Sequence, residues 1–464
     1  MKATDEKERN RLIFEEMPVG KALKEMAVPM IISQLILLIY NIADVYYIGR
    51  TNNPGMIAGA SLILPVYNVC FVFSNIASTG GGTLIARLLG VSKEDEARRV
   101  STFSILFSVV SSFVFAAATY FLMDDLLFAL GASDATFQYA KQYATCVIVI
   151  GAVPTIMGMT LGNLLRNAGY SKIAGYGFSM GGILNIILDP IFMFVILPEG
   201  SETLGAGIAT MISNVATCLL FVAVMIKSRS EIICLRPKEG LPSKDSMKAF
   251  FTVGIPAAIG PFLFDLDYII IDKLMAAYSD TALAAIGIVL KAERFPTNIG
   301  VGLCLGMVPI AAYNYSSGNI ERMTAVVKKA RYTGMIIGFS AIALYEIFAP
   351  QIMEFFIEDP STVELGTGFL RARSLATVFM FLSFIYVNYF QGVGKGVRAL
   401  QLMLLRWACL NIPLLFIMNA LFGINGVVWA QFTGDVITSV ISQAVYMQFS
   451  KTLSAEVTQV NNIM

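Results

Sequence analysis

The sequence predicts an all-α membrane protein with twelve transmembrane helices arranged in two six-helix lobes. The chain has 464 residues, of which 56% are hydrophobic and only 14% are charged, whereas soluble domains carry about 25% charged residues. Long apolar runs recur along the whole chain, and each is long enough for a helix that crosses a ~30 Å hydrocarbon core in about 20 residues. The two halves of the sequence also resemble each other.

Runs of Leu, Ile, Val, Phe and Met define the twelve predicted helices. They are too long and too continuous for the alternating strands of a transmembrane barrel. The predicted spans are residues 26–48, 57–86, 97–123, 135–165, 172–197, 204–226, 248–275, 281–312, 331–357, 361–390, 397–420 and 424–449.

The distribution of basic residues predicts the orientation of these spans. Short cytoplasmic loops are enriched in Lys and Arg, and here most of the 33 basic residues fall in the N-terminal segment and in alternate loops. The opposite loops are acidic and contain Asp124, Asp125, Glu199 and Glu202. We therefore expect both termini on the cytoplasmic side of the plasma (inner) membrane. Because the basic residues are spread over loops rather than gathered in one patch, we expect no nucleic-acid partner.

An internal repeat organises the chain. The segment "MAVPMIISQL" (26–35) resembles "VGIPAAIGPF" (253–262), and "GGILNII" (181–187) resembles "WACLNIP" (407–413). Six helices are an even number, so the halves have the same orientation, as in transporters whose two lobes flank a central pathway. The predicted organisation is an N-terminal segment, a first lobe, a cytoplasmic linker, a second lobe and a cytoplasmic tail, at residues 1–25, 26–226, 227–247, 248–450 and 451–464.

Several classes of chemistry are excluded by residue content. The chain has no histidine, which excludes a histidine base, a histidine metal site and a Ser-His-Asp triad. It has no GxxxxGK[ST] motif for ATP hydrolysis, and its six cysteines form no CxxC pair. We therefore expect no enzyme activity, no cofactor and no metal site other than one for a coupling Na⁺.

The first predicted lobe contains two carboxylates within apolar helices. Asp44 lies in "YNIADVYYIGR" with Tyr40 four residues before it, and Asn185 and Asp189 are four residues apart in the fifth span. Residues four apart share one helix face. Asp44 lies about five residues, and Asp189 about eight, from the outer ends of their spans, which gives them similar depths at ~1.5 Å per residue. They can therefore meet inside one lobe.

Such a pair suits a cation. Carboxylates that share a site of low dielectric resist double ionisation and bind a proton. Alternatively, their oxygens form a cage for Na⁺ together with the Asn185 carbonyl and a hydroxyl. Because intramembrane carboxylates are costly, they are usually functional. The structural alternative is an aspartate that is hydrogen-bonded between packed helices.

The second predicted lobe contains four acidic and four basic residues deep in its spans. At ~1.5 Å per residue all of them fall ~12–20 Å from the outer ends. The hypothesis is a buried ion network, some of whose charges face the central cavity and handle substrate or protons; the alternative is that each side chain extends singly to the membrane interface. The eight residues are Asp265, Asp267, Lys291, Glu293, Arg294, Glu346, Arg371 and Arg373.

Four motifs in a fixed order resemble the multidrug and toxic compound extrusion (MATE) family. They are "P…D" in the first span, "AR.LG…E.AR" after the second, "L.N.LR..G" at the end of the fourth and "N…DP" in the fifth. The branch that is most similar has an Asp in the first span and N-x-x-x-D in the fifth. The resemblance implies a V-shaped pair of six-helix lobes and export of a substrate against entry of H⁺ or Na⁺ by alternating access.

The resemblance also assigns roles to individual residues. Asp265 lies near a functional acid that some branches carry in the seventh span. Pro29 falls where the first span of the family can bend, although a tolerated membrane-helix proline explains it equally well. The implied cation site is Asp44, Asn185, Asp189 and Thr210, and the implied cavity-lining positions are Tyr40 and Asn163.

The expected function is antiport of amphipathic or cationic drugs or metabolites against H⁺ or Na⁺. One alternative is a lipid-linked oligosaccharide flippase of the same superfamily, which favours a strongly basic cavity and often two extra spans. Another is an exporter of an anionic or zwitterionic metabolite that uses the charges of the second lobe. The expected partners are a small-molecule substrate and the lipid bilayer, and we expect a monomer.

Overall fold

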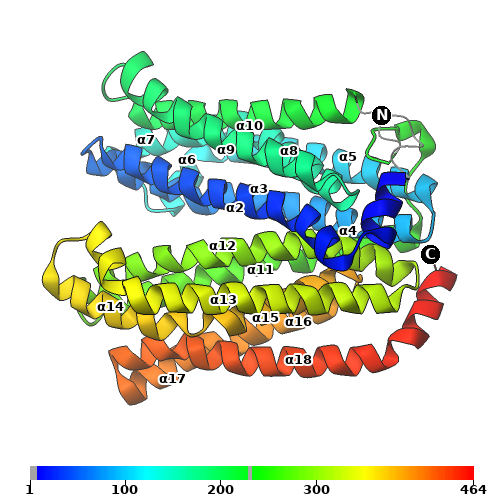
Figure 1. Ribbon diagram of the computed structural model, residues 1–464. Helices are drawn as coiled ribbons and strands as arrows, with labels where there is room; N and C mark the ends of the chain where they lie inside the picture. Colours follow the sequence, from blue (N-terminus) through cyan, green and yellow to red (C-terminus); the bar gives the residue numbers. More distant parts are fainter. Residues whose placement is uncertain (1–7, 228–231, 464) are drawn as a thin grey trace. The chain divides into compact units, whose positions relative to one another are not determined.

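The computed structural model describes residues 8–227 and 232–463, and every regular element in these ranges is a helix (Figure 1). The first half of the chain forms η1 (Leu12–Glu16), α2 (Val19–Gly49), α3 (Pro54–Asn75), η2 (Ile76–Gly80), α4 (Gly81–Gly90), α5 (Glu94–Phe121), α6 (Met123–Ala129), α7 (Asp134–Ala144), η3 (Thr145–Ile150), α8 (Ala152–Asn167), α9 (Ser171–Ile191), η4 (Phe192–Ile196) and α10 (Glu202–Lys227). The second half forms η5 (Pro237–Glu239), α11 (Lys244–Ala276), α12 (Asp280–Ser316), α13 (Ile320–Phe356), α14 (Pro360–Ser374), α15 (Thr377–Gly392), α16 (Gly396–Leu404), η6 (Leu405–Asn411), α17 (Ile412–Phe422) and α18 (Ile424–Ile463).

These helices confirm the predicted all-α membrane fold. Within the described residues, nine helices are long and apolar enough to cross a membrane, and eleven if each of two bent pairs forms one span. The bent pairs are α7–η3 with α8, bent by 49°, and α14 with α15, bent by 45°. The remaining predicted span lies in α18, which is less apolar because it buries Asp435, Thr438, Ser439 and Ser442 inside its unit.

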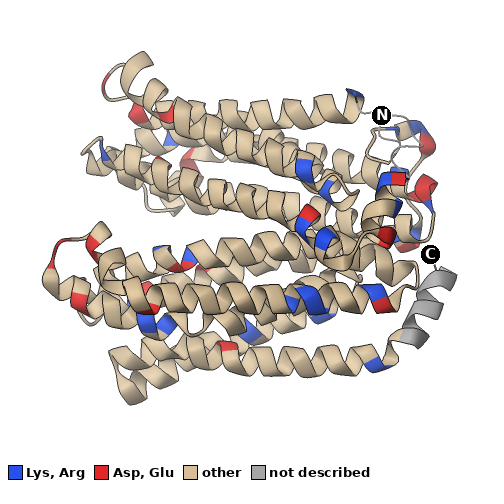
Figure 2. Ribbon diagram, viewed as in Figure 1, with Lys and Arg blue, Asp and Glu red and all other residues tan. Residues whose placement is uncertain are grey.

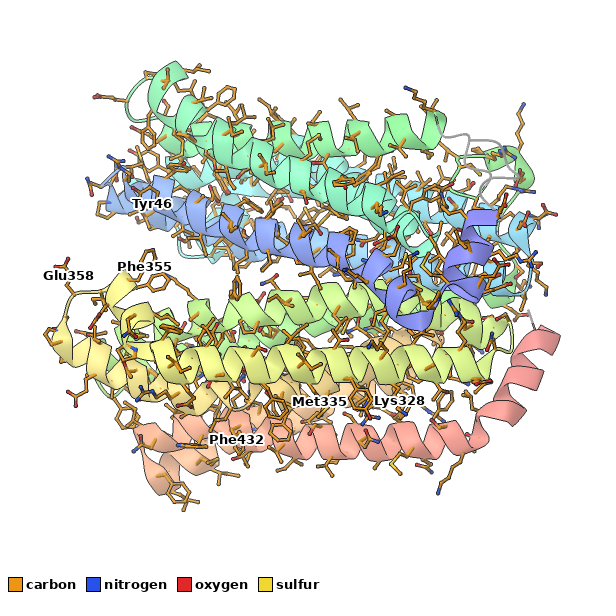
Figure 3. All side chains as sticks on the ribbon, viewed as in Figure 1. Tyr46, Lys328, Met335, Phe355, Glu358 and Phe432 are labelled. Carbon is orange, nitrogen blue, oxygen red and sulfur yellow. The ribbon has the colours of Figure 1, made fainter. Side chains whose placement is uncertain are left out.

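The side chains on the outside of the helices are those expected in lipid. Large apolar residues are strongly exposed, such as Val195 at 77% and Phe355 at 83%. Phe355 is labelled in Figure 3. Charged residues are sparse along the helices and gather toward the helix ends (Figure 2). One such end is the N-terminus of α14, where Asp359 accepts hydrogen bonds from the Thr362 N–H at 2.9 Å and the Ser361 hydroxyl at 2.6 Å.

The chain divides into two compact units that differ from the predicted lobes at two places. Unit 1 contains the segment that ends at Glu16 together with Ile32–Ala258, and unit 2 contains Met17–Ile31 and the chain from Ile259 onward. The first turns of α2 therefore pack in unit 2, and the first turns of α11 pack in unit 1. The sequence-based boundaries at residues 26 and 248 had instead assigned the first turns of α2 to the first lobe and those of α11 to the second lobe.

Close backbone contacts at glycine explain this exchange. In unit 1 a Cβ atom on Gly80 would lie 2.4 Å from the carbonyl oxygen of Phe250, in the first turns of α11. In unit 2 a Cβ atom on Gly306 would lie 2.4 Å from the Cα atom of Ala27, in the first turns of α2. Only glycine permits such an approach of two backbones. Gly80 and Gly306 occupy corresponding positions in the two repeats, so the exchange follows the internal symmetry.

Pro29, the candidate hinge, lies near the point where α2 passes from one unit to the other. It stands inside a continuous helix, two residues before the boundary at Ile31. Its repeat counterpart, Pro256, stands two residues before the boundary at Ala258 in α11. Proline lacks a backbone N–H and removes one hydrogen bond from the helix interior. Both helices are therefore locally weakened where they change units, and the hinge role of Pro29 stays a prediction.

Candidate cation site and a buried ion-pair cluster

Three of the four predicted cation-site residues meet in unit 1, on α9 and α10. The side-chain amide of Asn185 donates hydrogen bonds to the Thr210 hydroxyl at 3.2 Å and to Asp189 Oδ1 at 3.4 Å. All three side chains are buried. Pro190 follows Asp189 and lacks an N–H donor, and the π-helical segment η4 begins two residues later. The helix is thus irregular beside the carboxylate, as π-helical segments often are at functional sites.

Asp44 on α2 belongs to the same cluster. Its carboxyl group lies close enough to that of Asp189 for the two to interact electrostatically. Asp44 Oδ1, Asn185 Oδ1 and Asp189 Oδ2 are buried and have no hydrogen-bond partner among the described residues. An unsatisfied buried acceptor costs about 1–3 kcal/mol, and more when it is charged. The three oxygens are therefore acceptors for a proton or a cation.

Aromatic and polar side chains that the sequence analysis missed surround this cluster. Asn214 on α10 donates to the Tyr67 hydroxyl at 3.1 Å and to the Thr155 hydroxyl at 2.9 Å. Tyr67 and Tyr143 both interact electrostatically with Asp44. Asn214 could have been found, since it lies one helical turn after the predicted hydroxyl contributor on α10. Tyr67 and Tyr143 lie in apolar helices, and the sequence around them does not indicate that they lie near Asp44.

The two predicted cavity-lining residues differ in their relation to the site. Tyr40 is partly buried and interacts electrostatically with Asp44. Asn163, near the end of α8, accepts a hydrogen bond from Arg166 at 2.6 Å and donates one to the Met159 carbonyl at 2.9 Å. Tyr40 thus lies near the carboxylates, whereas the hydrogen bonds of the Asn163 side chain are made to residues of its own helix, α8.

Unit 2 buries two bidentate ion pairs. Arg373 on α14 donates from Nε and Nη2 to the two Glu293 oxygens at 2.8 and 2.9 Å. Arg406 on the π-helical segment η6 donates from Nε and Nη2 to the two Asp435 oxygens at 2.7 and 3.1 Å. All four side chains are buried. Parallel bidentate contacts are the strongest arginine–carboxylate geometry.

Asp267 on α11 is the third acid of this cluster. It accepts a hydrogen bond from the side-chain amide of Asn411 at 2.8 Å, and its second oxygen has no hydrogen-bond partner among the described residues. It interacts electrostatically with Arg373 and Arg406. Asn411 is the repeat counterpart of Asn185, so each unit holds an aspartate with the equivalent asparagine.

The hypothesis of one network of eight charges in the second lobe needs correction. Arg371 contacts Glu346 at 3.8 Å, and both side chains are almost half exposed. Arg294 is exposed and interacts with Asp265, and Lys291 is exposed. The physical reason is helix geometry, because residues two apart, such as 371 and 373 or 291 and 293, point to nearly opposite sides of a helix.

The buried cluster instead combines three predicted residues with two that the sequence analysis omitted. Asp267, Glu293 and Arg373 are the predicted members. Arg406 and Asp435 were omitted, although both lie inside predicted spans. The rule that intramembrane charges are rarely accidental applies to them equally and could have found them.

Comparison with known proteins decides the family. The sequence model of the MatE family matches the chain twice, at residues 29–191 and 256–417. The chain belongs to the MatE family. The two matches confirm the internal repeat, and membership makes this MatE protein a membrane transporter rather than an enzyme.

Individual relatives of this MatE protein cover nearly all of it. It is 32% identical over 425 residues to the multidrug export protein MepA of Staphylococcus aureus (strain MSSA476), covering 91% of this chain and 92% of the relative. It is 30% identical over 450 residues to MepA of Staphylococcus haemolyticus (strain JCSC1435), covering 97% and 98%.

Solved structures confirm the fold. An outward-facing multidrug resistance MATE family transporter of the MOP superfamily superposes with a TM-score of 0.90 at 20% identity, covering 99% of this chain and 100% of that one. A MATE protein in complex with MaL6 gives a TM-score of 0.89 at 20% identity, covering 97% and 99%. At this identity the likeness establishes the two-lobed, all-helical MATE fold and nothing finer.

Proposed function

We propose that the chain exports amphipathic, often cationic drugs or metabolites across the plasma membrane in exchange for H⁺ or Na⁺. Family membership and the multidrug export relatives support drug efflux. The observation that carries the coupling is the group of three buried, unpartnered oxygens of Asp44, Asn185 and Asp189. The proposal includes a monomer with both termini in the cytoplasm.

The donor set fits either coupling ion. Protonation of one carboxyl group would remove one of two interacting negative charges and provide an O–H donor. Na⁺ would take oxygen ligands from Asp44, Asn185 and Asp189, with the Thr210 hydroxyl as a further contributor. In either case the H⁺ or Na⁺ supplies the positive charge, because no described contact of Asp44 or Asp189 involves a basic side chain.

Alternating access couples this site to export. A cation can shift the transporter between outward-facing and inward-facing states only if its affinity differs between them. Entry from outside would load the unit 1 carboxylates and favour the state that releases the drug. Release of the cation to the cytoplasm would restore the charge pair and the affinity for the next substrate.

The flippase alternative is less well supported. It favours a strongly basic cavity, but in unit 2 the buried Arg373 and Arg406 are each paired with a carboxylate. The similar staphylococcal MepA proteins are multidrug export proteins. We therefore place drug export first.

The test is transport in proteoliposomes with an imposed pH or Na⁺ gradient. Asp44→Asn and Asp189→Asn should each abolish ion-driven uptake of a cationic dye such as ethidium, because each removes one charge from the site. Asp125→Asn, an exposed aspartate of α6 in the same unit, is the matched control and should transport as wild type. Full ion dependence in Asp44→Asn would overturn the assignment.

A further inference from the structure

The chain passes between the two units three times. Two of these passages lie inside helices at corresponding positions of the repeat, at Ile31 in α2 and at Ala258 in α11. The third lies between Glu16 and Met17, just before α2. It has no counterpart in the second half, because the segment 232–243 belongs to the same unit as the first turns of α11. The residues before α2 are therefore an addition to the repeat that links the units once more.

In unit 1 the segment 8–16 is anchored on the turn between α8 and α9. The Phe14 side chain is fully buried, and Ile13 and Asn10 are buried as well. A Cβ atom on Gly169 would lie 2.6 Å from Asn10 Oδ1 and 3.4 Å from the Phe14 ring. Gly169 has a φ of +88°, so the turn needs glycine both for its backbone and for the space that the segment fills.

Arg9 adds a charged contact to this anchor. Its guanidinium carbon lies 3.3 Å from the centre of the Tyr170 ring, and its Nη2 atom donates to the Ala168 carbonyl at 3.3 Å. An aromatic ring attracts a guanidinium group over its face electrostatically. Leu12, in the same segment, is 46% exposed. The anchor therefore depends on particular side chains of the segment and not on all of them.

The chain is anchored again in unit 2 directly after the passage. The Met17 carbonyl accepts a hydrogen bond from Arg322 Nη2, at the start of α13, at 2.6 Å. Met26 and Met30 of α2 are each 1% exposed, and a Cβ atom on Gly306 of α12 would meet the α2 backbone. This anchor extends over several turns of one helix, whereas the unit 1 anchor is one π-helical turn and the residues before it. The unit 1 anchor is therefore the one that releases first.

The chain between the two anchors is short. Phe14 and Met17 are three residues apart, and an extended chain spans at most about 3.3–3.6 Å per residue. Their Cα atoms can therefore be no more than about 11 Å apart in any conformation. While both anchors hold, the turn between α8 and α9 and the start of α13 cannot separate beyond what this short segment allows.

We propose that residues 8–17 form a strap that limits the separation of these helix ends, and that its unit 1 anchor must release before the transporter opens to the cytoplasm. The direction of opening rests on the proposed function, which places the termini in the cytoplasm. An alternating-access transporter opens by movement of one lobe against the other. A tether at one side thus favours the state that is closed at that side.

Distances between spin labels test the strap in the full-length protein in nanodiscs, without substrate or an ion gradient. Tyr176→Cys on α9 and Thr324→Cys on α13 place the labels at exposed positions of different units. Cys409, the exposed cysteine, is replaced by serine so that it carries no label. Arg9→Ala with Phe14→Ala removes the anchor and should raise the ratio of long to short label distances at least about tenfold.

Leu12→Ala is the matched control, because it shortens an exposed side chain of the same segment. It should leave the ratio of distances unchanged. A second pair of labels, at Leu12 and Tyr176, follows the strap itself, since both positions lie in unit 1. In the otherwise unchanged chain, the fraction of molecules in which this distance is long should match the fraction that is open between Tyr176 and Thr324. If the double variant fails to fold, as judged by gel filtration, Arg9→Ala alone should give a smaller change in the same direction.

Two results would overturn the proposal. An unchanged ratio in a folded Arg9→Ala/Phe14→Ala variant would show that the segment only stabilises unit 1. Molecules that open between Tyr176 and Thr324 while the Leu12–Tyr176 distance stays short would show that the docked segment does not limit opening. The proposed function fails separately, because full ion dependence in Asp44→Asn would refute the coupling site and leave the label distances as expected.

Discussion

Replacing Gly306 by alanine tests the contact that fixes the first turns of α2 in unit 2. The added Cβ atom would lie 2.4 Å from the Cα atom of Ala27 and 2.5 Å from its nitrogen. Both are backbone atoms, which cannot rotate away, so α2 and α12 must separate. Overpacking of this kind costs about 1–3 kcal/mol.

Gly287 provides the matched control because it lies on the same helix, α12, and a Cβ atom there would meet nothing within 4 Å. Exchanging glycine for alanine in a helix interior stabilises it by about 0.5–1 kcal/mol. Both Gly306→Ala and Gly287→Ala have this gain. The difference between their free energies of unfolding is therefore the cost of overpacking alone, about 1–3 kcal/mol.

The measurement is thermal unfolding of the purified protein in one detergent, followed by intrinsic fluorescence. At about 2–4 °C per kcal/mol for domains of 150–250 residues, Gly306→Ala should melt at least about 2 °C below Gly287→Ala. Gly80→Ala should behave like Gly306→Ala, since its Cβ would lie 2.4 Å from a backbone oxygen of α11. Equal melting temperatures for Gly306→Ala and Gly287→Ala would refute the reasoning.

Three further predictions concern buried and capping charges. Arg406→Ala leaves a buried carboxylate without its partner and should destabilise the chain by about 3–5 kcal/mol in the same thermal assay, and removing that carboxylate as well should restore most of the loss. Hydrogen bonds from the neighbouring serine and threonine hydroxyls and a backbone N–H lower the pKa of Asp359 below its usual value. Its ionised form therefore stabilises the fold above the ordinary aspartate pKa, and this contribution is lost as the pH falls through the lowered value. Asp359→Ala should thus reduce the melting temperature more at pH 7 than at a pH below the lowered pKa. Finally, Asn185→Asp should destabilise the fold more than Asn411→Asp, because only the second new carboxylate has guanidinium groups nearby; an equal loss would contradict this.

The sequence predicted the unit 1 site better than the unit 2 cluster for a geometrical reason. Asn185 and Asp189 are one helical turn apart, so their common face follows from the chain itself, and Asp44 was placed beside them by depth. Thr210 came only from the resemblance to the family, and its hydrogen bond to Asn185 depends on how α9 and α10 pack. Tyr67 was missed because its partner is likewise on another helix.

In unit 2 the depth argument was insufficient. It assigned Arg371 and Arg373 the same environment, but the turn of α14 buries one and leaves the other almost half exposed. The unit boundaries show the same limit. Hydrophobic runs define where α2 begins and ends, whereas the packing of its first turns depends on Gly306, which is distant in sequence.

The repeat relates the two units, and their differences in charge suggest different tasks. Each unit has an asparagine at the corresponding position, and each asparagine donates to an aspartate, Asp189 or Asp267. In unit 1 Asp189 interacts electrostatically with another acid, Asp44. In unit 2 the aspartate interacts with two arginines that retain unused donors. The same framework therefore carries two interacting acids in unit 1, whereas in unit 2 its aspartate lies beside two arginine–carboxylate pairs.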